Sequence, residues 1–115
     1  MKQRILVMNG QRLVQTEQEG QWNTINVEKA GNLKAGIYNL YRATDADKKQ
    51  EYVGMILHTD NAYVYQQKGR EVLRHDRKDF TVAPEHGAIK SISYDEQSRA
   101  ITVSATVSQS HSIRR

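Results

Sequence analysis

Residues 4–15 read RILVMNGQRLVQ, with a short apolar run on each side of Asn9-Gly10. An Asn-Gly pair accepts the positive φ angles of a type I′ turn, and the twist of that turn matches the twist of the two strands it joins. The segment therefore predicts a β-hairpin. It is the strongest local signal in the chain.

The same pattern of short strands between turns continues along the chain. Segments rich in β-branched and aromatic residues alternate with turns marked by Gly, Asn and Asp. We expect further strands at residues 22–27, 37–42, 52–57, 62–67, 70–75, 88–94 and 101–107. Asp76 is placed to cap a short helical turn, and no longer helical period is present. The predicted fold is all-β: a small antiparallel barrel or a strongly bent meander sheet, with at most a short helical turn near residues 76–80.

A chain of 115 residues is long enough for one compact domain and not for two. We expect a single β domain over residues 1–107 and a frayed C-terminal tail over residues 108–115. Trp22 follows a Gly-led turn and is expected to plug one end of the barrel. The predicted core consists of the apolar residues that alternate along the strands: Ile5, Val7, Leu13, Ile25, Val27, Leu40, Ile56, Leu57, Val72, Ile92, Ile101 and Val103.

Composition excludes several kinds of chemistry. The chain has no cysteine, which removes disulfides, thiolate zinc sites, iron–sulfur clusters and cysteine nucleophiles. No apolar run is long enough to cross a bilayer, and the first ten residues do not resemble a secretory signal, so we expect a cytoplasmic protein without membrane contact. The four histidines are scattered without metal-ligand spacing, and no metal site is expected; they are His58, His75, His86 and His111.

Catalytic patterns are also missing from the sequence. The serines and threonines of the last strands lie in regular alternation with no sharp elbow around them, and the paired acids lie in turns where water keeps both charged. The glycines do not follow the spacing of a phosphate-binding loop. We therefore expect no catalytic residue, no cofactor and no enzymatic activity.

Basic residues gather between positions 68 and 78, next to three rings. Such a stretch offers cations for phosphates and flat rings for bases, as a nucleic-acid-binding surface requires. The candidate nucleic-acid-binding residues are Tyr63, Tyr65, Lys68, Arg70, Arg74, His75, Arg77 and Lys78. The alternative is the solvated rim of a hairpin, with Tyr63 or Tyr65 facing the core and His75 packing to hold a turn capped by Asp76.

A protein-interaction module is the other class of function. The chain has six tyrosines, one Trp and one Phe, so some ring is expected on the surface, where tyrosine and arginine serve well as anchors. A DNA-mimic role would require a dense acidic surface, and the net charge of +4 argues against it. The partner is therefore expected to be nucleic acid or a protein, and the oligomeric state is left open.

Tyr-Gln-Gln at residues 65–67 is followed by Arg-His-Asp at residues 74–76. With this motif as the most specific part of the likeness, residues 52–103 resemble the KfrB domain, a small family found mainly in proteins of conjugative plasmids and other mobile elements. Gly87 and the strands at 52–57 and 89–94 also fit, whereas the turn at 95–98 lacks the usual glycine. The resemblance implies a non-catalytic accessory role in plasmid maintenance or transfer, exercised by binding a macromolecule. A protein partner, on this resemblance, would be plasmid-encoded or a host protein.

Overall fold

The computed structural model describes residues 2–105 and consists almost entirely of β-strands. The strands are β1 (Gln3–Met8), β2 (Gln11–Gln18), β3 (Gln21–Lys29), β4 (Gly36–Tyr38), β5 (Thr44–Asp45), β6 (Tyr52–Thr59), β7 (Tyr63–Lys68), β8 (Glu71–Asp76), β9 (Ile89–Tyr94) and β10 (Ala100–Ser104). Two short 3-10 helices, η1 (Leu40–Arg42) and η2 (Arg77–Asp79), interrupt them. The all-β prediction is confirmed, as is the helical turn near residues 76–80.

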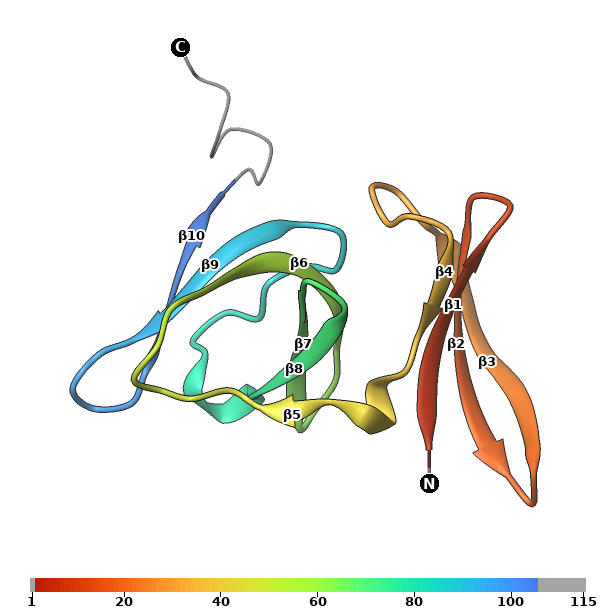
Figure 1. Ribbon diagram of the computed structural model, residues 1–115, viewed down its shortest axis with the longest axis horizontal. Coiled ribbons are helices and arrows are strands. Elements are labelled where there is room, and N and C mark those ends of the chain that lie inside the picture. The colour runs from red at the N-terminus through yellow and green to blue at the C-terminus, as the bar shows by residue number, and fades with distance from the viewer. Residues whose placement is uncertain (1, 106–115) are drawn as a thin grey trace, which may run out of the picture.

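The strands form two sheets that lie beside each other (Figure 1). The first, called here the N-terminal sheet, has the order β3-β2-β1-β4. The second, the six-stranded sheet, has the order β10-β9-β6-β7-β8-β5, and only its β5–β8 pair is parallel among the pairs of residues 2–105. The six-stranded sheet is strongly bent but does not close, so of the two predicted architectures the bent sheet is the compatible one.

The first hairpin forms as its sequence predicts. Asn9 and Gly10 have φ angles of 53° and 74°, and Met8 pairs with Gln11 across the turn. Glu19 and Gly20 repeat the same positive φ angles at the next turn. Two turns of two residues each therefore fix the register of β1, β2 and the beginning of β3.

The bend of the six-stranded sheet is made by strand β6. Its first half, from Tyr52 to Met55, pairs with β9, whereas its second half pairs with β7. At the crossing point the end of β7 passes directly over Gly54, where an added Cβ atom would lie 1.8 Å from the carbonyl oxygen of Gln67. Only glycine can occupy this position without moving the neighbouring backbone.

The bend produces two hydrophobic cores. The inner face of the N-terminal sheet packs against the outer side of β6 and β7, which joins Ile5, Val7 and Val14 to Leu57 and Tyr65. The inside of the bent sheet holds the other core, made by Ile56, Val64, Phe80 and Ile92. Strand β7 is consequently covered on both faces.

Arg12 joins the two sheets through polar contacts. Its buried guanidinium donates to the carbonyl oxygen of Leu57, at 2.9 Å from Nη2 and 3.3 Å from Nε. Nη2 also lies 2.8 Å from Nδ1 of His58, and Nη1 lies 3.3 Å from a carboxylate oxygen of Glu28. A guanidinium can only donate, so His58 accepts through Nδ1.

Part of the predicted core is wrong. Ile5, Val7, Leu40, Ile56, Leu57 and Ile92 are buried, and Leu13 and Val72 are half-buried. Four other predicted core residues are between 46% and 59% exposed; they are Ile25, Val27, Ile101 and Val103. The first two lie on β3 and the other two on β10, and each of these strands forms the outer edge of its sheet, so alternation alone did not reveal which face is covered.

Two further expectations at particular residues are corrected. Asp76 precedes η2, but its side chain makes no capping hydrogen bond. Trp22 plugs no barrel end; it is half-buried and lies beneath the guanidinium of Arg4.

No helix within residues 2–105 is long and apolar enough to span a membrane. The predicted frayed tail at residues 108–115, and the end of the strand predicted at 101–107, lie outside the described residues.

We expect Gly54→Ala to destabilise the protein by about 3 kcal/mol or more, because the new Cβ atom collides with backbone rather than with a flexible side chain. Urea unfolding monitored by tryptophan fluorescence measures the change. The control is Val53→Ala at the neighbouring, half-exposed position, which should cost less than about 1 kcal/mol. Equal stability of the two variants would contradict the proposed crossing of β7 over β6.

Candidate nucleic-acid interface

The predicted binding residues lie on the β7–β8 hairpin, but they do not form one surface. Tyr65 is 7% exposed and His75 is 1% exposed, so neither ring is available to a partner. Tyr63, Tyr65 and Arg74 share the face that packs toward the N-terminal sheet, whereas His75 points to the opposite face, inside the bend. The expectation that these rings face outward together is wrong.

His75 belongs to a buried hydrogen-bond network. Gln66 is fully buried, and its side-chain nitrogen donates to three backbone carbonyls, those of Tyr52, Gly54 and Lys90, at 3.0–3.3 Å. Its side-chain oxygen lies 2.9 Å from Nε2 of His75. Because that oxygen can only accept, His75 carries its proton on Nε2.

The other ring nitrogen of His75 completes the network. Nδ1 lies 2.5 Å from the hydroxyl of Tyr94, which therefore donates to it. Burial lowers the pKa of His75 to about 4 and raises the pKa of Tyr94, so the imidazole stays neutral and the phenol stays protonated. The arrangement holds four strands together and leaves His75 no free atom for chemistry.

Three other candidate residues, Tyr63, Arg74 and Arg77, make contacts within the chain. Arg74 donates from Nε to Asp45 at 2.6 Å, and its guanidinium carbon lies 4.7 Å from the centre of the Tyr63 ring. The pKa of Asp45 is lowered by this hydrogen bond and by the charge of Arg74. Arg77 donates to the carbonyl oxygen of Phe80 at 3.0 Å.

Three predicted cations remain exposed, at opposite ends of the hairpin. Lys68 and Arg70 lie at the β7–β8 turn, and Lys78 lies in η2. No ion pair involves any of the three within residues 2–105. Their binding role stays a prediction, but they do not form one binding surface with Tyr65 and His75.

A different group of cations and rings lies at the end of the N-terminal sheet near the first residues of β1. We call it the cation–aromatic cluster; its members are Lys2, Arg4, Trp22, Tyr41 and Arg42. The guanidinium of Arg4 lies 4.1 Å from the centre of the Trp22 ring, and the centres of the Trp22 and Tyr41 rings are 6.0 Å apart. Lys2 and Arg42 lie 5.2 Å and 5.7 Å from the centre of the Tyr41 ring.

Hairpin register and η1 position the cluster. Arg4 pairs with Gln15, and Gln15 pairs with Thr24, which brings Arg4 next to Trp22 across β2. Arg4 also donates to the side-chain oxygen of Gln15 at 2.8 Å. Helix η1, which follows β4, brings Tyr41 and Arg42 to the same end of the sheet.

The cations of the cluster contact rings and not acids. Within the described part of the chain, neither Lys2, Arg4 nor Arg42 lies in an ion pair. A ring attracts a cation without cancelling its net charge. The cluster therefore keeps an uncompensated positive charge next to two partly exposed aromatic rings.

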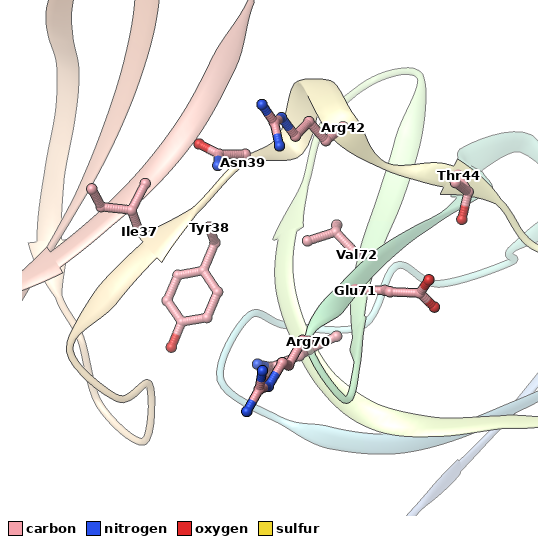
Figure 2. Close-up of a pocket in the computed structure, with 9 residues that line it drawn as sticks. Ile37, Tyr38, Asn39, Arg42, Thr44, Arg70, Glu71 and Val72 are labelled. Atoms are coloured by element: carbon pink, nitrogen blue, oxygen red, sulfur yellow. The ribbon is translucent and has the colours of Figure 1, made fainter.

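A pocket of about 310 Å³ opens next to the cluster, between the two sheets. Arg42 and Arg70 lie on opposite sides of it in Figure 2, with the ring of Tyr38 between them. A second pocket, of about 550 Å³, shares Tyr38 and Gln67 with the first. The two pockets therefore adjoin at the junction of the sheets, and together they are called here the hollow.

Residues 51–104 match the model of the KfrB domain family. This segment, just under half of the chain, is similar to the KfrB domain. The chain is also similar to "Protein TraB" of Escherichia coli, with 36% identity over 94 residues, which covers 79% of this chain and 64% of that relative. Because an alignment of 94 residues is longer than the KfrB segment, the likeness to this relative extends beyond the KfrB domain.

The most specific residues of the likeness to the KfrB domain have a structural role in this chain. Gln66 and His75, from the two parts of the motif, are hydrogen-bonded to each other inside the bend. Every member of the cation–aromatic cluster, by contrast, lies outside residues 51–104. The sequence held a signal for part of it, since the two hairpin turns set the register that places Arg4 near Trp22.

No group of three or more metal-binding side chains comes together within residues 2–105. The histidines that the structure describes are engaged elsewhere: His58 with Arg12, His75 with Gln66 and Tyr94, and His86 with Glu28 at 3.3 Å. Burial, aided by the charge of Arg12, lowers the pKa of His58 to about 4.

We predict that stability falls as the pH drops from about 6.5 to about 4, because an unfolded His75 takes up a proton near pH 6.5 and the folded one only near pH 4. The contribution of His75 is complete above pH 6.5 and is lost by up to about 1.4 kcal/mol per pH unit below it. Urea titrations across this range measure the slope.

His58→Gln removes the other strongly shifted histidine and serves as the matched control. Its slope should be shallower than that of the native chain but should remain positive because His75 is still present. A flat profile between pH 6.5 and 4 in this variant would show that His75 is not buried in its neutral form.

Proposed function

We propose that this protein is a non-catalytic accessory protein of plasmid maintenance or transfer that binds nucleic acid through its cation–aromatic cluster. The observation that carries the proposal is the contact of three cations, none in an ion pair within residues 2–105, with two neighbouring rings at one end of the N-terminal sheet. The site proposed from the sequence, on the β7–β8 hairpin, is replaced by this one because Tyr65 and His75 are buried.

The chemistry of the cluster suits a nucleic acid. Lysine and arginine bind phosphates, and exposed aromatic rings accept stacked bases of any sequence. Arginine stacked on tryptophan is already held in place, so little side-chain freedom is lost when it binds a phosphate. The net charge of +4 favours approach to a polyanion.

The plasmid role is supported by the comparisons. The likeness to the KfrB domain and to Protein TraB favours a plasmid-associated protein of maintenance or transfer. The chain spans 64% of the length of that relative. We propose action in the cytoplasm, where plasmid DNA and the RNA made from it are present.

The test is binding of a fluorescein-labelled single-stranded oligonucleotide, measured by anisotropy over a series of salt concentrations. We expect the native chain to bind at low salt with an affinity that falls steeply as salt rises. Lys2→Gln/Arg4→Gln should weaken binding roughly tenfold or more and reduce the salt slope by about 1.4, the value for two lost phosphate contacts on a single strand.

Lys29→Gln/Lys49→Gln is the matched control, because both lysines are exposed, neither is a candidate binding residue, and the change in charge is the same. It should bind as the native chain does. Equal losses in the two double variants would remove the cluster as the site, and would leave only a general effect of charge. Thermal unfolding of both variants confirms that the fold is intact, since exposed charges and cation–π contacts contribute about 1 kcal/mol or less.

A protein-interaction module without nucleic-acid binding is the second candidate. It is favoured by the exposed apolar side chains of the six-stranded sheet, where Val53, Ile101 and Val103 are about half exposed. Val53 and Val103 both pair with Ser91, so they lie on one face across three strands. Absence of oligonucleotide binding by the native chain at low salt would favour this candidate.

A further inference from the structure

We propose that the hollow between the two sheets receives the bases of a single-stranded nucleic acid, with Arg42 and Arg70 holding the backbone at its rim. The inference rests on the proposed nucleic-acid binding and extends it. It assigns a strand type and a path to the bound ligand.

Arg42 connects the cluster to the hollow. Its guanidinium lies 5.7 Å from the ring centre of Tyr41, and the same side chain lines the first pocket. A strand bound on Tyr41 would therefore reach the pocket along Arg42. Arg70, on the β7–β8 turn, meets the strand on the other side.

The lining of the first pocket suits a nucleobase. Ile37, Tyr38 and Val72 offer apolar and aromatic surface, and the side chains of Asn39 and Gln67 offer donors and acceptors for base edges. Its volume of about 310 Å³ lies at the lower end of the range for small-ligand pockets, which often form where two structural units meet.

The second pocket continues the path along the junction of the sheets. It is larger, about 550 Å³, and is lined by Val53, Met55 and Ile89 with Lys34 at its side. The hollow therefore combines an apolar floor with cations near its edges. This is the distribution expected for a ligand whose bases are buried and whose phosphates stay at the rim.

The charges around the first pocket favour an anionic ligand. Neither Arg42 nor Arg70 lies in an ion pair within residues 2–105. Glu71 is the acidic member of the lining, and Figure 2 shows its carboxylate directed away from both guanidinium groups. The two arginines therefore keep their charge for phosphates.

The shape of the site selects a single strand. A duplex keeps its bases paired and stacked inside, so it offers phosphates and groove edges but no free base to enter a pocket. A single strand offers both unstacked bases and phosphates. The hollow thus predicts a preference for single-stranded over double-stranded ligand, which the cluster alone would not give.

The experiment compares a labelled single-stranded oligonucleotide with a duplex of equal length. The native chain should bind the single strand roughly tenfold more tightly, and Arg42→Gln/Arg70→Gln should lose most of this preference. Lys29→Gln/Lys49→Gln, with the same change in charge, should keep it. Deoxy- and ribo-oligonucleotides are used in parallel, and a preference for the single strand with either sugar supports the inference.

A blocking experiment uses the absence of cysteine from the chain. Thr44→Cys places a single thiol at the exposed edge of the first pocket, and Gln97→Cys places one in the exposed β9–β10 turn. A bulky maleimide at position 44 should abolish the single-strand preference, whereas the same label at position 97 should not.

The outcomes separate this inference from the proposed function. Equal affinity of the native chain for both forms, or a preference that survives both the arginine replacements and the label at position 44, would overturn the pocket while leaving the cluster in place. Tighter binding of a poly-glutamate peptide than of the oligonucleotide would overturn it in favour of an acidic protein segment. Absence of all oligonucleotide binding at low salt would overturn the proposed function itself.

Discussion

The side-chain amide of Gln66 is the constraint on which the structure depends. It is buried where β7 crosses β6, and a buried amide is tolerated only when its donors and acceptor are satisfied. Three backbone carbonyls and the ring of His75 provide that satisfaction, and they come from β6, β8 and β9. The absence of a side chain at Gly54 allows the strands to approach closely enough for these bonds to form. The bend follows from this crossing.

The same constraint explains why the most specific motif of the sequence was misread as a surface. Val64, Tyr65 and Gln66 are consecutive and all buried, because the N-terminal sheet covers one face of β7 and the bend encloses the other. The local sequence pattern does not predict that both faces of a strand will be covered. One error was avoidable, however, since adjacent strand residues point to opposite faces, and Arg74 and His75 could not have faced a partner together.

Local chemistry predicted what depends on a few neighbouring residues. The Asn9-Gly10 turn fixed the first hairpin, and the alternation of the chain indicated an all-β fold. Together with the turn at Glu19-Gly20, these two features are enough to predict that Arg4 lies near Trp22. They do not predict the position of Tyr41 and Arg42, which depends on the path of η1 between β4 and the six-stranded sheet. Tertiary packing decided that half of the site, and it also decided that Val27 and Val103 lie outside the core.

The cations of the cation–aromatic cluster differ from the ion-paired cations elsewhere in the chain, and this difference is the reason for placing the binding site at the cluster. In the six-stranded sheet and its loops, Arg74 contacts Asp45, Lys48 contacts Asp79 at 2.8 Å and Arg99 contacts Asp95 at 3.1 Å. Each of those charges is compensated within the chain. Lys2, Arg4 and Arg42 lie against rings instead, which orders their side chains but leaves their field unbalanced. A polyanion gains little from a cation that already has a carboxylate partner, because that pair must first be separated. Cations that are held in place by neutral rings can bind a phosphate at once, and one of them, Arg42, also lines the first pocket.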